Sequence, residues 1–189
     1  MICTASEVTI YTDISCSAGT AALSLLIPIV QERINLITNN YFLSDMYMGG
    51  SVTFNATAGT IVAGSSFADE GFVAGDEIYI YNSYRNDGYK TVGSVTTVTL
   101  TLSGSSVINE PSGRNVLISV VSWPNSLKYI AAQMIKYDYD DRPSNVPGIS
   151  SKSLGPYSVS YQGGIGITPF GYPQEMIDAL STYTVARLT

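Results

Sequence analysis

Residues 20–40 carry the clearest pattern of apolar and polar positions in the chain. Apolar side chains recur there at steps of four and three residues, which is the spacing of one face of an α-helix. Thr20 is placed to cap the start of this helix, Asn39 and Asn40 are placed to end it, and Pro28 in its interior predicts a kink. The predicted apolar face consists of Leu23, Ile27, Val30, Ile34 and Ile37, widened by Leu26 and Ile29. A helix with so wide an apolar side needs apolar partners elsewhere in the chain.

A period of two replaces the helical spacing between residues 51 and 121, where Val, Thr, Ile, Tyr and Gly are frequent. Alternation of this kind is typical of β-strands. Gly75-Asp76 predicts a turn, and Asn86-Asp87-Gly88 predicts a tight hairpin turn because Asp-Gly readily adopts positive φ angles. Strands are expected at 52–55, 60–62, 77–81, 89–92, 95–102 and 116–121, with a polar loop at 103–114. Such short strands predict a small barrel or sandwich.

Helical spacing is found again on both sides of this β block. Thr4 or Ser6 can cap a short first helix over residues 4–11, with Glu7 in its first turn. Further helices are expected at 126–137, with Pro124 at a first helical position, and at 174–182, opened by Pro173. Between these two helices, residues 138–171 hold four prolines and predict an extended arm, in which 157–161 is the best strand of one strand pair.

The order of the elements predicts an α+β chain of two parts. Residues 1–48 and 122–189 are expected to form a small helical bundle with an extended C-terminal arm at 138–171. Residues 49–121 are expected to form a β-barrel or sandwich-like domain. Because helices that need one another lie on both sides of the β block, this domain is interpreted as an insertion into a helical core.

The composition excludes several classes of function. Of 189 residues, 45% are hydrophobic, 13% are charged and 14 are Tyr, so part of the surface is expected to be buried against other chains. A net charge of -6 with nine basic residues argues against a protein that grips nucleic acid. The sequence has no His, which excludes the common catalytic triads and the HExxH metal motif. No enzyme activity, catalytic residue, metal or cofactor is therefore expected.

Cysteine usage and the apolar runs indicate the compartment. Cys3 and Cys16 have no CxxC spacing and are expected to be free thiols. No signal peptide is visible, and the longest apolar stretch, 25–30, is far shorter than the roughly 20 residues that a membrane span requires. A soluble, cytosolic product is expected.

Two acidic clusters are candidates for chemistry. Asp138, Asp140 and Asp141 offer oxygens that Ca²⁺ or Mg²⁺ prefers, but the spacing lacks the Gly and the terminal Glu of an EF-hand. A solvated, acidic helix end is the preferred interpretation. The second cluster, Asp69-Glu70 with Asp76-Glu77, suits general acid and base work as in glycosidases. Solubilising turns are the better interpretation there.

Several short features occur together in this chain. A helix pair begins the sequence, and a third helix follows the proline of Trp123-Pro124-Asn125. The segment 153–161 has the form small-Gly-x-Tyr-Ser-Val-x-Tyr, and residues 171–183, near the C-terminus, are Gly-Tyr-Pro-Gln-Glu-Met-Ile-Asp-Ala-Leu-Ser-Thr-Tyr. In this combination the chain resembles the head-tail connector adaptor, or head-completion, proteins of tailed bacteriophages. The β block looks like a barrel insertion that some phage neck proteins carry.

The resemblance implies a structural virion protein at the head-tail interface, assembled in the cytoplasm of a bacterial host. It implies a homo-oligomeric ring, expected as a dodecamer, that docks under the portal protein and receives the next neck, terminator or tail protein. DNA passes through such a ring without sequence-specific binding, and no membrane is involved. The implied residues are Tyr183, Val185, Arg187 and Leu188 for portal binding; Asp138, Asp140 and Asp141 for an acidic lining of the DNA tunnel; and Tyr157, Val159 and Tyr161 for an inter-subunit arm.

Two other classes of protein stay open. Tyr-rich β surfaces can stack on sugars, so a carbohydrate-binding or tail-fibre-like β module is one alternative. Such a module would be mostly β, whereas helices that frame the β block favour the adaptor. The other alternative is a capsid decoration protein, which would bind capsid faces rather than the portal.

Overall fold

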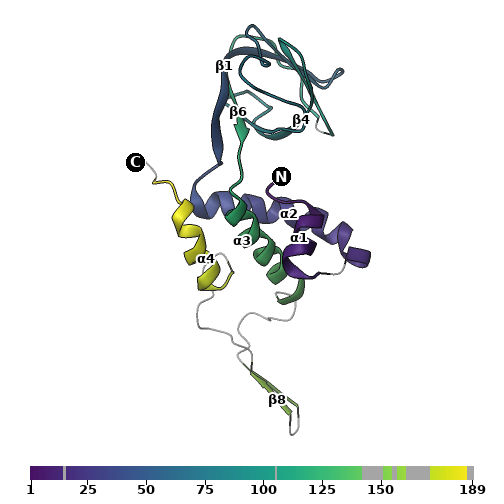
Figure 1. The fold of residues 1–189 in the computed structure, drawn as a ribbon, viewed down its shortest axis with the longest axis vertical. Coiled ribbons are helices and arrows are strands. Elements are labelled where there is room, and N and C mark those ends of the chain that lie inside the picture. Colours follow the sequence, from purple (N-terminus) through teal and green to yellow (C-terminus); the bar gives the residue numbers. More distant parts are fainter. Residues whose placement is uncertain (15, 105, 142–150, 155–156, 161–170, 187–189) are drawn as a thin grey trace. The chain divides into compact units, whose positions relative to one another are not determined.

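A computed structural model gives the fold (Figure 1) and describes residues 1–14, 16–104, 106–141, 151–154, 157–160 and 171–186. At 16–20, 45–47, 141, 151–154 and 157–160 the backbone alone is described. The chain divides into two compact units, Met1–Asn40 with Trp123–Thr189, and Tyr41–Ser122. The first unit is mainly helical and the second is built from antiparallel strands, so the expected α+β class is confirmed. The β unit begins at Tyr41, earlier than the predicted boundary at Gly49.

The two N-terminal helices are α1 (Ala5–Thr12) and α2 (Cys16–Thr38). The predicted capping box of α1 is confirmed, because Thr4 Oγ1 accepts from the Glu7 backbone N–H and the Glu7 carboxylate accepts from the Thr4 N–H. The predicted start of α2 at Thr20 is wrong, since a single interior glycine costs only about 1 kcal/mol and Gly19 does not stop a helix. The predicted end is confirmed: Asn39, with φ 50°, adopts the left-handed conformation that ends many helices.

One face of α2 forms the centre of the helical core. Leu23, Ile27, Val30 and Ile34 are all at most 1% exposed, as their spacing predicts. The predicted widening of this face by Ile29 is wrong, because Ile29 is 43% exposed on the side away from the buried stripe.

Helix α2 is relevant to the expectation that the chain has no membrane span. Over Ala21–Thr38 it is long and apolar enough to cross a membrane, with a mean hydropathy of 1.3, although its longest apolar run is short. It is the one such helix in the described part of the chain, and 39% of this stretch is buried inside the structure. A core helix of a soluble protein passes the same test, so this is weak evidence for a membrane span.

The C-terminal part of the helical unit contains α3 (Asn125–Lys136), the π-helical turn η1 (Tyr137–Asp141), α4 (Gln174–Leu180) and the 3-10 turn η3 (Ser181–Tyr183). Pro124 and Pro173 stand at the N-cap positions, and Pro124 therefore lies one position before its predicted place. Helix α3 packs against α1, α2 and α4. Its side of the core consists of Leu127, Ala131, Ala132, Met134 and Ile135.

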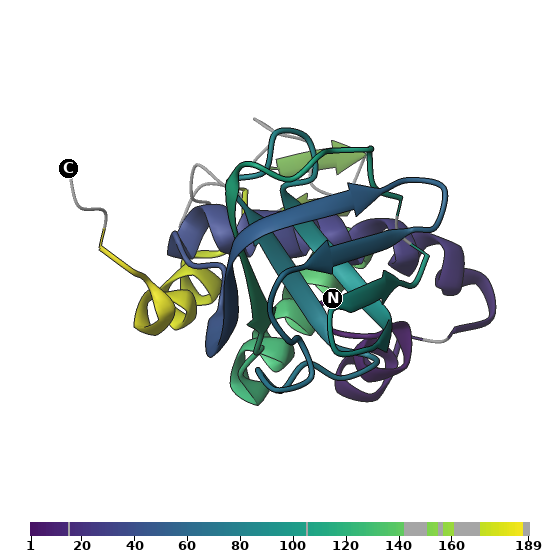
Figure 2. The same cartoon turned by 90° about the horizontal axis from the view of Figure 1, so that it is seen from above.

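The β unit contains six strands. Figure 2 shows the fold from above. They are β1 (Leu43–Asn55), β2 (Thr60–Ala63), β3 (Glu77–Tyr81), β4 (Gly88–Val95), β5 (Thr99–Leu102) and β6 (Asn115–Val121). All pairs are antiparallel, in the order β1-β2-β5-β4-β3-β6. Because β1 also pairs with β6, the strands close into a barrel.

Apolar side chains at alternate positions of the strands fill the inside of this barrel. On β3, Ile78 and Ile80 are fully buried, whereas Tyr81 is 59% exposed. The barrel core consists of Met48, Val52, Phe54, Ile61, Ala63, Phe67, Phe72, Ile78, Ile80, Val92, Leu100, Leu102, Val107, Val116, Ile118 and Val120.

Two of the predicted β features differ in the structure. The expected strand at 95–102 is broken by a turn, in which the Thr96 N–H donates to the Thr99 carbonyl at 2.8 Å. The expected tight turn at Asn86-Asp87-Gly88 is wrong, because β3 ends at Tyr81 and the connection covers residues 82–87. Side chains shape this longer loop: Asp87 Oδ1 accepts hydrogen bonds from both the N–H and the hydroxyl of Ser83.

A buried polar cluster fastens this loop to the next one. Asn86 is 2% exposed and Glu110 is 5% exposed. Asn86 Nδ2 donates to Glu110 Oε2 and to the Ile108 carbonyl, both at 3.0 Å, and Asn86 Oδ1 accepts from the Ile108 N–H at 2.8 Å. Glu110 Oε1 accepts from the Tyr84 N–H at 2.9 Å. Each of these hydrogen bonds satisfies a polar group whose burial without a partner would cost free energy.

The predicted arm contains a strand pair, β7 (Ser151–Leu154) with β8 (Tyr157–Ser160). The strands are antiparallel, with Ser151 opposite Ser160 and Leu154 opposite Tyr157. The strand expected at 157–161 therefore forms, and Tyr161 lies outside the described residues.

Candidate assembly surfaces

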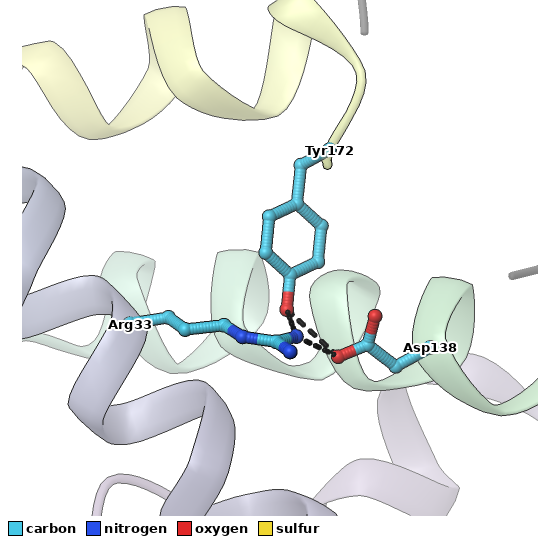
Figure 3. A network of polar contacts seen from close by, with 3 residues as sticks. All are labelled: Arg33, Asp138 and Tyr172. Carbon is cyan, nitrogen blue, oxygen red and sulfur yellow. Dashed lines mark hydrogen bonds and ion pairs between the residues drawn. The ribbon is translucent and has the colours of Figure 1, made fainter. Parts of the chain in front are cut away.

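A cluster of three polar side chains, which we call the clasp, joins three distant segments of the helical unit (Figure 3). Arg33 comes from α2, Asp138 from η1, and Tyr172 from the residues just before α4. Arg33 Nη1 lies 2.7 Å from Asp138 Oδ2 and donates to the Tyr172 hydroxyl at 2.7 Å, and that hydroxyl donates to the same carboxylate oxygen at 2.7 Å. The guanidinium also lies 5.5 Å from the centre of the Tyr172 ring.

Burial makes the clasp a strong constraint on the fold. The Asp138 side chain is 3% exposed, and Tyr172 is fully buried, whereas Arg33 is 32% exposed. Burial raises the pKa of the Tyr172 phenol to about 12, although the hydrogen bond from Arg33 opposes this rise. Burial lowers the pKa of Arg33, but its contacts with Tyr172 and Asp138 outweigh that effect and hold the pKa above its ordinary value. The phenol is thus neutral and the guanidinium charged at neutral pH.

The clasp changes which of the three predicted acids can line a DNA tunnel. Asp138 is buried against Arg33 and Tyr172, so its charge is compensated inside the chain and is not presented to a channel. Asp140 is exposed, which keeps it as a candidate for the tunnel lining. The side chain of Asp141 lies outside what the structure describes. Sequence reasoning singled out neither Arg33 nor Tyr172, although Arg33 is the one basic residue in a long apolar helix.

The predicted portal-binding tail is anchored to the end of α2. The Val185 N–H donates to the Thr38 carbonyl at 2.8 Å, and Asn39 Nδ2 donates to the Val185 carbonyl at 3.2 Å. Asn40 Nδ2 donates to the Tyr183 carbonyl at 3.2 Å. The two asparagines that end the helix therefore also hold the C-terminal segment, a role that their sequence position did not predict.

Of the two predicted tail residues that the structure describes, one has its side chain hydrogen bonded and the other is exposed. The Tyr183 hydroxyl is hydrogen bonded to the Ser126 hydroxyl, while the Val185 side chain is 49% exposed. Arg187 and Leu188 lie outside the described residues. For the predicted arm contacts, the backbone of Tyr157 and Val159 is in β8, whereas their side chains and Tyr161 are not described.

A second apolar face lies on α2, and the sequence analysis did not separate it from the first. We call it the outer stripe: Leu25 is 69% exposed, Ile29 43% and Leu36 58%. At 3.6 residues per turn, these three positions fall within about 40° of one another around the helix. The spacing of four and seven residues is the signal that could have found them. Leu25, Ile29 and Leu36 thus form an exposed apolar line on the helix, and the exposed Glu32 lies on the same side between Ile29 and Leu36.

Aromatic side chains gather on the barrel. The Tyr41 and Tyr79 rings stack with centroids 4.6 Å apart, and Tyr89 meets Tyr79 edge to face at 4.9 Å. Burial raises the pKa of Tyr79 to about 12. On the same barrel, Tyr84 is 66% exposed and carries the Arg114 guanidinium 4.7 Å from its ring centre.

Acids do not converge into a metal site in the described part of the chain, where no group of three or more His, Cys, Asp or Glu is placed to hold an ion. Asp69 and Glu70 lie exposed on the loop before β3. Comparison of the sequence with protein-family models finds no match, and comparison with curated proteins finds none.

Proposed function

We propose that this protein is a head-tail connector adaptor of a tailed-bacteriophage virion, with no enzymatic activity of its own. In this proposal the helical unit is a bundle that carries an inserted β-barrel and an extended arm, and copies of it close into a ring, expected as a dodecamer. The ring binds the portal protein on one face and the next neck, terminator or tail protein on the other. DNA passes through its lumen.

The outer stripe of α2 is the observation that carries the proposal. The opposite face of the same helix already fills the core of its own unit, so the stripe is surplus to the fold of one chain. Burying aliphatic surface away from water lowers the free energy by about 25 cal/mol per Å². This favours covering Leu25, Ile29 and Leu36 with a neighbouring copy. A ring supplies that cover for every copy at once.

A different apolar group gives the ring its second contact surface. Ile10 on α1 is 75% exposed and Tyr129 on α3 is 52% exposed. Tyr11 is 37% exposed and meets Tyr129 edge to face, with centroids 5.8 Å apart. Two unlike apolar surfaces on one unit suit a head-to-tail contact, in which one side of a subunit meets the other side of its neighbour.

The clasp supports the role proposed for the arm. It brings the residues before and after the segment 142–170 together, because Tyr172 donates to Asp138 at 2.7 Å. The segment therefore leaves the helical unit and returns to it at one place. A chain that is tied at both ends in this way can extend to a neighbouring subunit without loosening the bundle. The β7–β8 pair lies within it, and an isolated strand pair gains stability from a partner.

Ring assembly tests the proposal most simply. Leu36→Glu places a charge in the outer stripe and is expected to abolish the oligomer that native mass spectrometry detects for the unmodified chain. The control is Ser24→Glu, which adds the same charge at an exposed position of α2 about 100° to 140° away from the stripe. Unchanged assembly of the Leu36 variant would remove the outer stripe from the proposal. Failure of the unmodified chain to bind the portal protein would remove the adaptor role.

The aromatic row of the barrel favours a second candidate, a carbohydrate-binding module. Tyr41, Tyr79 and Tyr89 form a row in which ring faces and hydroxyls lie together, and sugars stack on such faces. The discriminating test is binding to glycans by the whole chain and by the variant Tyr41→Ala, whose residue is 45% exposed. Loss of glycan binding in that variant, with portal binding absent, would favour the module over the adaptor.

A further inference from the structure

The two ends of the barrel differ in their charged side chains: two arginines lie at one end, beside the exposed Asp87 and the buried Glu110, and exposed acids lie at the other. Strand β3 begins after the loop 64–76 and ends before the loop 82–87, so these two loops lie at opposite ends of the barrel. The barrel unit has three basic residues, and two of them, Arg85 and Arg114, lie at the end of loop 82–87, which we call the arginine end. At the other end, which we call the acidic end, loop 64–76 exposes Asp69 and Glu70.

The arginine end holds its guanidinium in a fixed position. Arg114 donates from Nε and Nη2 to Asn82 Oδ1, at 3.2 and 2.7 Å, and lies 4.7 Å from the centre of the Tyr84 ring. Asn82 has a φ of 68°, a conformation that non-glycine residues rarely adopt, and its Nδ2 donates to the Asn115 carbonyl at 2.7 Å. Asn adopts this left-handed conformation more readily than most residues, and the hydrogen bond to Asn115 fixes its side chain beside Arg114.

This fixed guanidinium has no carboxylate partner among the described residues, and Nη1 is not used by Asn82. Tyr84, whose ring it contacts, is 66% exposed, and Tyr81 at the end of β3 is 59% exposed. Tyr and Arg are the residues that most often dominate protein-protein contacts, particularly when their conformation is set before binding.

The acidic end presents a loop whose exposed charges are opposite to that of Arg114. Phe67 and Phe72 anchor the loop in the barrel core, with their rings edge to face at 5.5 Å. Between them, Asp69 and Glu70 are exposed and form no ion pair in the described part of the chain. Val73, directly after this anchor, is 58% exposed and adds an apolar contact beside the acids.

We propose that the arginine end of one barrel binds the acidic end of the barrel in a second copy of this chain. Arg114 donates to the carboxylates of Asp69 and Glu70 in the neighbouring copy. Tyr84 packs against Val73 of that copy. The two surfaces are different and complementary, so the contact runs head to tail and repeats from copy to copy. This inference rests on the proposed ring, in which it gives the barrel its own part of the subunit contact.

A charge exchange tests this contact. Arg114→Glu, and separately Asp69→Lys with Glu70→Lys, are each expected to raise the protein concentration needed for half-maximal assembly at least tenfold in native mass spectrometry. Combining all three substitutions is expected to recover most of the loss, because each charge again meets its opposite. The matched control reverses two exposed acids of α4, Glu175→Lys with Asp178→Lys, and leaves assembly unchanged.

The outcomes separate this inference from the proposed function. Folding is monitored by circular dichroism, and the milder pair Asp69→Asn with Glu70→Gln, at exposed positions, keeps the test valid if Arg114→Glu does not fold. A ring that forms equally well in every variant overturns the barrel contact but leaves the adaptor proposal standing. A chain that neither assembles nor binds the portal protein in its unmodified form overturns the adaptor proposal itself. If Arg114→Glu and the pair Asp69→Lys with Glu70→Lys each reduce assembly, and combining them does not restore it, the barrel contact is also overturned.

Discussion

Replacing Tyr172 by Phe removes one oxygen atom from the clasp and leaves the ring that fills the core. Tyr172 is fully buried, and because only its hydroxyl oxygen is removed, the void that is left is small. The hydroxyl donates to Asp138 and accepts from Arg33, both at 2.7 Å. A hydrogen bond to a charged group contributes about 1.5 to 3 kcal/mol, and Arg33 remains to compensate the carboxylate. We therefore expect Tyr172→Phe to lower the free energy of unfolding of the helical unit by about 1.5 to 3 kcal/mol.

Urea denaturation followed by the helical circular dichroism signal measures this loss. The control is Tyr84→Phe, at a position of the barrel that is 66% exposed, and it is expected to change stability by less than about 0.5 kcal/mol. A pH series adds an independent readout. The pKa of Tyr172 is raised to about 12, so its contribution is complete below pH 10 and is lost as the pH rises toward 12. If Tyr172→Phe keeps full stability, or keeps the same alkaline loss as the unmodified chain, the clasp does not hold the unit together.

Three further predictions concern other parts of the chain. A backbone hydrogen bond from Thr4 at the start of α1 lowers the pKa of Glu7. The ionised carboxylate therefore stabilises the fold above the ordinary pKa of a glutamate, and this stabilisation is lost as the pH falls through the lowered pKa. In a pH series of melting temperatures, Glu7→Gln should reduce the drop in melting temperature at acidic pH. Burial raises the pKa of Cys3 to about 12, so in a Cys16→Ser background the thiol should react with iodoacetamide only in denaturant, and rapid reaction of the folded protein would contradict its burial. Asn86→Ala removes the side-chain donor to the buried Glu110 Oε2, while the Tyr84 N–H still donates to Oε1, and should cost about 1 to 3 kcal/mol in barrel unfolding; a loss below about 0.5 kcal/mol would count against this cluster.

Local signals in the sequence predicted the elements well. The spacing of Leu23, Ile27, Val30 and Ile34 located the buried face of α2, because a helix places positions three and four apart on one side. The capping box of Thr4 located the start of α1 for the same kind of reason, since all its atoms lie within one turn.

Interactions between distant residues could not be predicted in the same way. Arg33, Asp138 and Tyr172 are far apart in the sequence, and their meeting depends on how α2, η1 and the lead into α4 pack. Burial then reversed the prediction for Asp138, because a carboxylate at a solvated helix end and one paired with an arginine look alike in sequence.

The turn at 86–88 was mispredicted for a related reason. Asp-Gly favours a tight hairpin, but the side chain of Asp87 bonds back to Ser83 and Asn86 reaches Glu110 across to another loop. These contacts stabilise a longer connection, and tertiary hydrogen bonds outweigh the local preference of two residues.

The central claim is the proposed adaptor role, and cryo-electron microscopy of this chain mixed with the portal protein of the phage that the proposal implies tests it most directly. The claim predicts a closed ring of this chain, coaxial with the portal, in which the outer stripe of α2 is covered by a neighbouring copy. Class averages in which the chain stays monomeric and detached from the portal, with Leu25 and Leu36 facing solvent, would contradict it.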